Sequence, residues 1–309
     1  MADLSPSIVI GIPTFRRPTL LRILLESLVE EVRGRDVLIV IADNECGAEV
    51  PALARSFEDR MPAVMVVAEP TRGISANRNA LVQATYERAP AWQWLVMVDD
   101  DGRVAPGWLQ ALLDVAARTG AHVTGGAVEF PLPDGAGIFA RNSDYSRPRR
   151  HPSGPIDELI GAQSICFARK VEQLVQRPWF DAAFGLSGGE DQELFWRLKQ
   201  AGAQFAFANE SLVIEPTPPE RATAGSVLHR SFTSGVASVR TQRRLEGRLA
   251  TFKTTCGHLF RVSAALVVHS LLGRKDRLVR TVINGAFAVG RLPGMARLTG
   301  HRYEWVRRR

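Results

Sequence analysis

An apolar strand that ends in three aspartates is the feature that most constrains this chain. Residues 95–98 are all apolar, and such a short run predicts a strand buried on both faces, as in a parallel sheet covered by helices. Asp99, Asp100 and Asp101 follow directly. Because parallel strands present their carboxyl ends to the ligand crevice of an open α/β sheet, we expect the three carboxylates to lie at that crevice.

The aspartate trio favours a metal site. Three adjacent carboxylates repel one another, and burying them without partners costs several kcal/mol. A divalent cation relieves this repulsion, and oxygen ligands suit Mg²⁺ or Mn²⁺. The alternative is a solvated acidic turn, which an aspartate pair alone would favour. The trio instead follows an apolar strand directly and precedes a further helix near Trp108, which favours a metal–phosphate site.

The first hundred residues alternate predicted strands and helices. Apolar runs at residues 7–14, 37–42 and 61–68 predict three more strands, and residues 18–28 predict a helix with a broad apolar face. A strand, a helix and a strand within about forty residues form a βαβ unit, which should be parallel and right-handed. The pattern predicts the α/β fold class.

Polar side chains follow all four predicted strands. They are Thr14 and Arg16, then Asp43, then Arg72, and finally the aspartate trio. Each could separately be an ordinary turn or surface residue. Because the carboxyl ends of parallel strands share one edge of a sheet, their joint occurrence favours convergence on one ligand.

The pattern becomes less regular after Asp101. Residues 121–130 and 160–168 predict further strands, and residues 131–158, rich in Pro, Gly, Arg and Ser, predict a long surface loop of the kind that often acts as a lid.

A Gly-rich segment, residues 180–189, leads to a helix that opens with Glu190 and Asp191. Acidic residues at a helix N-terminus are favoured by the helix dipole alone. The functional alternative is a general base that the helix amides keep ionised.

Charge divides the chain near residue 215. Residues 216–309 hold 18 Lys and Arg against 4 Asp and Glu, whereas residues 1–215 hold 21 against 28. We therefore predict a catalytic domain at residues 1–215 and a basic helical region at residues 216–309. Such a basic region suits an anionic partner, either lipid or nucleic acid.

Two helices are expected in the basic region, at residues 257–272 and 278–292. Neither reaches the roughly 20 clean apolar residues of a membrane span, and Arg261 and His269 interrupt the first. The region could pack on the catalytic domain, or it could lie in the headgroup region of a membrane. Its aromatic residues sit among aliphatic ones, which argues against nucleic acid as the partner.

The cysteines and the first residues bear on location. Cys46, Cys166 and Cys256 are scattered and form no CxxC pair, which favours a reducing compartment. The first six residues lack the apolar region of a signal peptide. We expect a cytoplasmic location, or a peripheral one on the cytoplasmic face of the inner membrane.

Four motifs, in this order, resemble those of the family 2 glycosyltransferases of the GT-A fold. Residues 10–17 are similar to that family's first strand and nucleotide loop, and residues 72–79 to its GxxARN helix start. The aspartate trio resembles its DxD element, and residues 188–191 resemble its acceptor-side ED motif. The resemblance covers roughly residues 7–215.

The resemblance implies a Rossmann-like, mostly parallel sheet flanked by helices, with a C-terminal helical extension. It also implies an inverting transfer from a nucleoside-diphosphate sugar with Mg²⁺ or Mn²⁺ as cofactor. Asp99 and Asp101 would bind the metal, Asp191 would be the base, and Glu190 would contact the acceptor. The implied contacts to the nucleotide sugar are Pro13, Thr14, Arg16, Asp43, Arg72, Asn79, Asp99 and Asp100.

The chain departs from the processive members of that family. Their QxxRW motif is represented only by QRRL at residues 242–245, and their multi-span membrane region is absent, so the transfer of one sugar is expected. Residues 290–295 and 300–304 resemble the tails of bacterial exopolysaccharide glucosyltransferases of the succinoglycan type, and a lipid-linked saccharide acceptor would suit a membrane position. The alternatives are a nucleotidyltransferase on a similar sheet and a nucleic-acid-binding protein.

Overall fold

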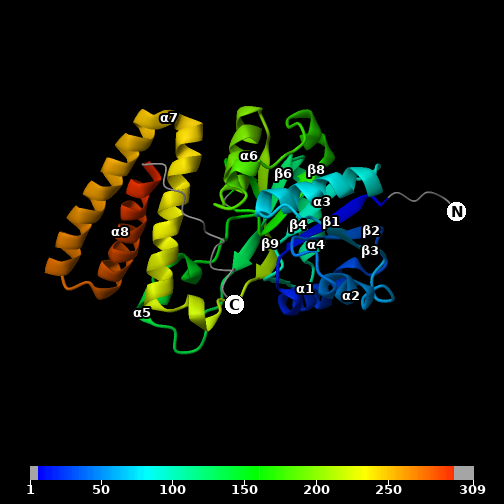
Figure 1. Ribbon diagram of the computed structural model, residues 1–309, viewed down its shortest axis with the longest axis horizontal. Helices are drawn as coiled ribbons and strands as arrows, with labels where there is room; N and C mark the ends of the chain where they lie inside the picture. The colour runs from blue at the N-terminus through cyan, green and yellow to red at the C-terminus, as the bar shows by residue number, and fades with distance from the viewer. Residues whose placement is uncertain (1–5, 160, 296–309) are drawn as a thin grey trace. The chain divides into compact units, whose positions relative to one another are not determined.

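The computed structural model describes residues 6–159 and 161–295, which form two compact units (Figure 1). The α/β unit comprises the described residues up to Glu129 together with Arg149–Gly185 and Glu190–Glu215. The helical unit comprises Phe130–Pro148, Leu186–Gly189 and the described residues from Pro216 onward. The proposed functional boundary near residue 215 stays a prediction.

The α/β unit is built on a mixed sheet in the order β3-β2-β1-β4-β8-β6-β9-β5, with β7 paired to β9 (Figure 1). Its first four strands, β1 (Ile8–Thr14), β2 (Val37–Asp43), β3 (Val64–Ala68) and β4 (Trp94–Val98), are parallel. Their carboxyl ends therefore share one edge, as the sequence predicted. The third strand begins at Val64, three residues later than expected.

The remaining strands give the sheet its mixed character. They are β5 (Arg103–Val104), β6 (Val123–Glu129), β7 (Gly154–Ile156), β8 (Ser164–Ala168) and β9 (Phe205–Ile214). β8 lies antiparallel between β4 and β6, and β6 pairs parallel with β9. Because β8 covers the free edge of β4, the strand that carries the aspartate trio is central and fully paired.

The described residues of the α/β unit form five helices: α1 (Pro18–Val32), α2 (Glu49–Arg55), α3 (Ile74–Arg88), α4 (Trp108–Thr119) and α6 (Glu190–Gln200). α1 begins at Pro18, a residue that suits the first turn of a helix because its fixed φ is already helical. The N-cap and C-cap of α4 are Gly107 and Gly120, both in the left-handed region that glycine adopts without steric cost.

The core of this unit is aromatic on the α3 side. Trp92 and Trp179 are fully buried, and Tyr86 meets both with its ring edge-on. Buried aromatic side chains contribute large apolar areas, and edge-to-face pairs add to this. The core therefore fixes α3, the helix that begins directly after Arg72 and Gly73.

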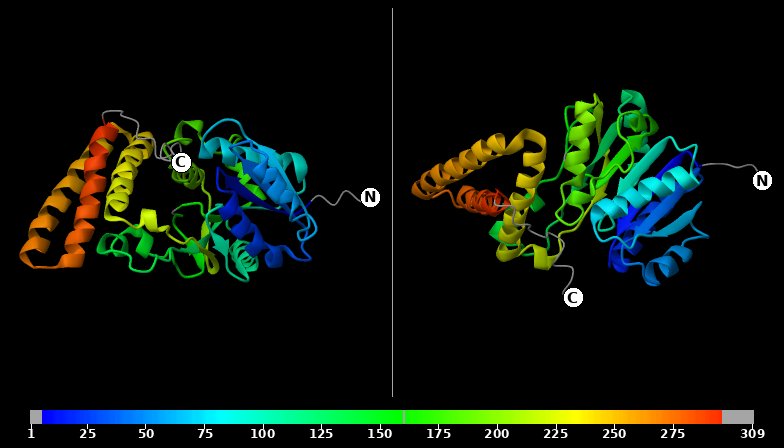
Figure 2. Two further views of the ribbon diagram at one scale, coloured as in Figure 1. Left: turned by 60° about the horizontal axis from the view of Figure 1, so that its bottom comes forward. Right: turned by 45° about the horizontal axis from the view of Figure 1, so that its top comes forward.

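The helical unit contains α5 (Ile138–Arg141), α7 (Ala224–Leu271) and α8 (Lys275–Met295). α7 is interrupted at Gly247, whose φ of 83° and ψ of 176° separate residues 224–246 from residues 248–271. α8 lies between these two segments (Figures 1 and 2), and Arg291 accordingly contacts Ser238 on the first and Thr255 on the second. A Cβ at Gly290 would collide with the Phe232 carbonyl oxygen, so this close helix contact requires glycine.

Two expectations are corrected here. Residues 131–158 are not a structureless loop, because they contain α5, a 3₁₀ turn at Asp144–Ser146 and strand β7, each too short to show a periodicity. A long first segment of α7, residues 224–246, was not predicted. Further 3₁₀ turns lie at Arg169–Gln173, Ala182–Phe184 and Pro219–Arg221.

Within the part of the chain that the structure describes, no helix has the length and apolar character to cross a bilayer.

Candidate active site

The three aspartates after β4 differ in their surroundings. Asp100 is buried, and its carboxylate accepts hydrogen bonds from the Thr14 hydroxyl at 2.7 Å and from Arg17 at 3.2 Å. The same Arg17 nitrogen donates to Asp101 at 2.9 Å. Burial raises the pKa of Asp100 to about 7, and the charge of Arg17 opposes this rise. Arg17, at the start of α1, thus neutralises part of the repulsion that a bound cation was expected to relieve.

A buried arginine joins the third aspartate to α6. Arg78, on α3, donates to Asp99 at 2.9 Å and to Glu190 at 2.7 Å. Burial alone would lower the pKa of Arg78, but the charges of Asp99 and Glu190 outweigh it and raise the pKa. Arg78, Asp99 and Glu190, here called the buried ion cluster, connect α3, the end of β4 and the start of α6.

Polar atoms around the buried ion cluster lack partners. Among the described residues, Glu190 Oε2, Arg78 Nε and Asn77 Oδ1 are buried and accept or donate no hydrogen bond. Burial raises the pKa of Glu190 to about 7, against the influence of Arg78. Because native proteins satisfy nearly all buried polar groups, these atoms indicate a place for a ligand or water.

Asp191 follows Glu190 on the first turn of α6 and is partly exposed. Its carboxylate accepts from the backbone N–H of Gln192 at 2.8 Å. Gly188 and Gly189 precede it with φ values of 74° and 93°, a backbone conformation that favours glycine. The carboxylate therefore sits at a helix start after a glycine turn, as predicted.

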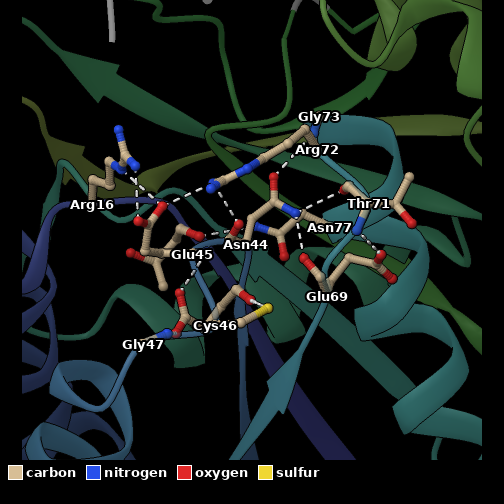
Figure 3. Close-up of polar contacts among 12 residues, drawn as sticks. Arg16, Asn44, Glu45, Cys46, Gly47, Glu69, Thr71, Arg72, Gly73 and Asn77 are labelled. Carbon is tan, nitrogen blue, oxygen red and sulfur yellow. Dashed lines mark hydrogen bonds and ion pairs between the residues drawn. The ribbon is translucent and has the colours of Figure 1, made fainter. Parts of the chain in front are cut away.

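A second ion cluster lies at the ends of β1 and β2 (Figure 3). Glu45 accepts from Arg16 Nε at 2.7 Å and from Arg72 Nη1 at 2.9 Å. Both guanidiniums lie over the Phe15 ring, at 5.2 Å for Arg16 and 4.4 Å for Arg72. These four residues are here called the exposed arginine cluster. It carries one net positive charge and an aromatic face.

Backbone conformation supports a functional role for this cluster. Arg16 has a φ of 56°, in the left-handed region that non-glycine residues seldom adopt. Such backbone conformations cost of order 1–3 kcal/mol and concentrate at ligand sites.

An asparagine sets the position of Arg72. Asn44 donates to the carbonyl oxygens of Glu69 and Thr71 at 2.6 and 2.8 Å, and its Oδ1 accepts from the Gly73 N–H at 3.0 Å (Figure 3). These bonds fix the loop from β3 to α3. Asn44 was not assigned a role from the sequence, although its place directly after Asp43 at a strand end was the available signal.

Other predicted residues hold loops. Asp43 accepts from the backbone N–H groups of Glu45 and Gly47 at 2.9 and 3.1 Å, and so shapes the loop after β2. The Asn79 side chain donates to the Phe180 carbonyl oxygen and accepts from the Phe180 N–H. Pro13 is buried in β1 opposite Ala42.

The structure thus brings the predicted residues to one sheet edge or to helices beside it, and their contacts with a nucleotide sugar stay a prediction. Arg78 and Arg17 were missed. Both lie inside the quoted motifs, but neither was assigned a role.

The aspartate trio does not form a preassembled metal site. Among residues 6–159 and 161–295, no group of three or more His, Cys, Asp and Glu side chains is arranged to hold a metal ion. Mg²⁺ is commonly held by one or two carboxylates together with substrate phosphates and water, and a single carboxylate pair is enough for that. Asp99 and Asp101 are both partly exposed and supply hard oxygen donors. They fit a metal that binds together with a diphosphate.

Comparison with known proteins places the chain in a family. Residues 9–172 match the model of glycosyl transferase family 2, and the chain belongs to this family. It is 32% identical over 233 residues to the succinoglycan biosynthesis protein ExoM of Rhizobium meliloti (strain 1021), covering 73% of this chain and 72% of that protein.

Two solved structures are similar in fold. The mannosyltransferase PcManGT from Pyrobaculum calidifontis, in complex with GDP-Man and Mn²⁺, gives a TM-score of 0.56 at 18% identity over 93% of this chain and 87% of that one. S. aureus TarS 1-349 gives a TM-score of 0.52 at 13% identity, over 92% of this chain and 90% of that one. The predicted family, the α/β GT-A fold and the enzyme class, a glycosyltransferase, are confirmed.

Proposed function

We propose that this glycosyltransferase transfers one sugar, with inversion, from a nucleoside-diphosphate sugar to a hydroxyl group of a saccharide acceptor. One observation carries the proposal: the exposed arginine cluster, the aspartate trio and the buried ion cluster all gather at the carboxyl ends of the parallel strands. Donor-binding, metal-binding and base functions would then meet at one edge of the α/β unit.

The exposed arginine cluster supports donor binding. Guanidinium groups bind phosphate oxygens through charge-assisted, often bidentate hydrogen bonds, and an aromatic ring offers a face to a nucleotide base. Arg16 and Arg72 have exposed guanidiniums over the Phe15 ring, and only Glu45 among the described carboxylates is paired with them. A diphosphate can replace Glu45 as their partner.

Asp99 and Asp101 would hold Mg²⁺ or Mn²⁺ together with the donor. When bound, the metal supplies positive charge that stabilises the leaving nucleoside diphosphate. The solved complex of PcManGT with GDP-Man and Mn²⁺ is consistent with this choice of ion for the fold. Before the donor and the metal bind, Arg17 holds Asp100 and Asp101 in place.

Asp191 would take the proton of the acceptor hydroxyl. It is partly exposed, and its carboxylate oxygen is held only by a neighbouring backbone N–H among the hydrogen bonds described for it. Glu190 is less suited, because it is buried and one of its oxygens is bound to Arg78. The orphaned Glu190 Oε2 would instead accept a hydrogen bond from the acceptor.

The acceptor is proposed from the chain's relative. ExoM is named as a succinoglycan biosynthesis protein, and we place this enzyme likewise in bacterial exopolysaccharide synthesis. The acceptor would be a lipid-linked saccharide on the cytoplasmic face of the inner membrane. Peripheral contact of residues 216–309 with that membrane belongs to the same proposal.

The test of the base is Asp191→Asn. The amide keeps the size and the capping ability of the carboxylate but takes no proton, so acceptor-dependent turnover should fall about 10²–10⁴-fold. Donor affinity, measured on the same sample by calorimetry, should persist. Asp114→Asn on the exposed face of α4 is the matched control. Retained turnover would remove Asp191 from the mechanism, and lost donor binding would assign it to the donor pocket.

The test of the metal site is Asp101→Asn. Binding of a nucleoside diphosphate should lose its dependence on Mn²⁺ while the melting temperature without metal stays close to that of the parent. Unchanged Mn²⁺-dependent affinity would contradict the assignment. Analysis of the product adds a check of the reaction class, because release of pyrophosphate in place of nucleoside diphosphate would mean nucleotidyl transfer.

A further inference from the structure

The second segment of α7, residues 248–271, carries an uncovered apolar face. Leu249, Phe252, Phe260, Val267 and Leu271 are between 52% and 82% exposed. With 3.6 residues per helical turn, these positions fall on one side of the helix. They are called the apolar stripe, and from residue 249 to residue 271 it is about 33 Å long at 1.5 Å per residue.

The packed side of this segment is mixed in polarity. Thr251 and Thr255 are 0% and 1% exposed, and Thr255 accepts from Arg291 of α8. Val262 lies close to Gly285 of α8. A helix of an ordinary globular subdomain buries its apolar side and exposes its polar side. Here hydroxyl and apolar side chains share the packed side, and the side with Phe260 and Leu271 is open. Packing among the described residues of the helical unit therefore does not account for the apolar stripe.

Basic residues border the apolar stripe. Arg248, Lys253 and Arg261 are exposed on the same segment, and residues 247–275 contain no Asp or Glu. Arg274 and Lys275 continue the basic character at the turn into α8. A helix with Phe and Leu on one side and Lys and Arg beside them is typical of helices that lie in the plane of a membrane interface.

We infer that the apolar stripe is a docking surface for an anionic lipid bilayer, with the segment lying flat in the headgroup region. Charge complementarity selects this partner. In a two-fold pairing of copies, the same patch faces itself, so the uniformly basic borders would repel one another. Anionic lipid attracts those borders while the apolar side chains enter the acyl boundary. The inference rests on the proposed function and deepens it, because it names the surface within residues 216–309 and the lipid charge that would bring the enzyme to a lipid-linked acceptor.

The experiment uses the full chain and co-sedimentation with vesicles of phosphatidylglycerol and phosphatidylethanolamine. Phe260→Gln combined with Leu271→Gln should lower the vesicle partition coefficient about tenfold or more, because two exposed apolar anchors are lost. Ile23→Gln on α1 is the matched control, since Ile23 is 47% exposed but lies in the α/β unit. The control should bind vesicles like the parent. Vesicles of phosphatidylcholine alone should bind the parent weakly.

Two outcomes would overturn the inference. The first is a parent protein that ignores anionic vesicles at low salt. The second is equal vesicle binding by the double variant and the parent. If light scattering then showed that the parent is a dimer and the double variant a monomer, the apolar stripe would be assigned to contact with a second copy. Transfer to a soluble saccharide acceptor, measured on the same samples, tests the proposed function separately, because neither Phe260 nor Leu271 belongs to the α/β unit.

Discussion

The two ion clusters of the α/β unit use the same groups in opposite arrangements. In the buried ion cluster one arginine, Arg78, lies between two carboxylates, whereas in the exposed arginine cluster one carboxylate, Glu45, lies between two guanidiniums. The side chains of Arg78 and Glu190 are 4% and 5% exposed and that of Asp99 is 29% exposed, whereas those of Arg16, Glu45 and Arg72 are 33–45% exposed. The two clusters therefore differ in how far their ion pairs are shielded from solvent.

This difference assigns separate tasks to the two clusters. A buried charge that loses its partner keeps the full cost of desolvation, so the buried ion cluster holds α3, β4 and α6 in a fixed relation. Exposed ion pairs contribute little to stability and exchange partners readily. The exposed arginine cluster can therefore release Glu45 for a phosphate without loss of the fold.

The largest effect is expected at Arg78. Arg78→Met leaves Asp99 and Glu190 without their shared partner, and breaking a buried ion pair typically costs about 3–5 kcal/mol of unfolding free energy. Arg78→Lys keeps the positive charge but lacks the planar guanidinium that reaches both carboxylates. Its loss of unfolding free energy should therefore be smaller than that of Arg78→Met. Urea denaturation measures both variants. Parent-like stability of Arg78→Met would show that the buried ion cluster holds nothing together.

A smaller effect is expected from the titration of Glu190. Its pKa is raised to about 7 in the folded protein, so the folded state keeps this proton to higher pH than the unfolded state does. The associated stability is present below about pH 4.5 and is lost as the pH rises through 7. Between pH 5 and 8 the parent should therefore lose about 1–3 kcal/mol more unfolding free energy than Glu190→Gln. Glu58→Gln, an exposed site on the same unit, is the control and should follow the parent. If the unfolding free energies of the parent and of Glu190→Gln depended on pH in the same way, the raised pKa of Glu190 would be contradicted.

The sequence predicted the parallel half of the sheet because its signals are local. Apolar runs such as residues 95–98 and the helix that begins at Pro18 show their periodicity within a few residues. Polar residues at strand ends, such as Thr14 and Asp43, then follow from the topology of parallel strands. For the same reason the edge of the sheet that holds the candidate site could be predicted.

The pairing of side chains could not be predicted in this way. Arg78 and Glu190 are 112 residues apart, and no spacing rule relates them. Strands of two or three residues, such as β5 and β7, are too short for a pattern. Periodicity also does not tell which side of a helix is covered, so the apolar character of residues 257–272 was visible but the exposure of Phe260 was not.

The smallest effect is expected at Glu45, and it is the sharpest test of the difference between the clusters. Hydrogen bonds from Arg16 hold the pKa of Glu45 below its ordinary value, so any stability from this pair is present at neutral pH and lost only as the pH falls. Because the side chains are exposed, Glu45→Gln should shift the melting temperature by less than about 2 °C.

The same variant should bind a nucleoside diphosphate more tightly, by less than about tenfold, because Glu45 no longer competes with the phosphates for Arg16 and Arg72. Calorimetry at low and high salt measures this, and the gain should shrink at high salt as the charges are screened. A loss of stability as large as that of Arg78→Met would mean that exposure does not separate the two clusters. Weaker diphosphate binding would mean that Glu45 itself positions the two arginines for the donor.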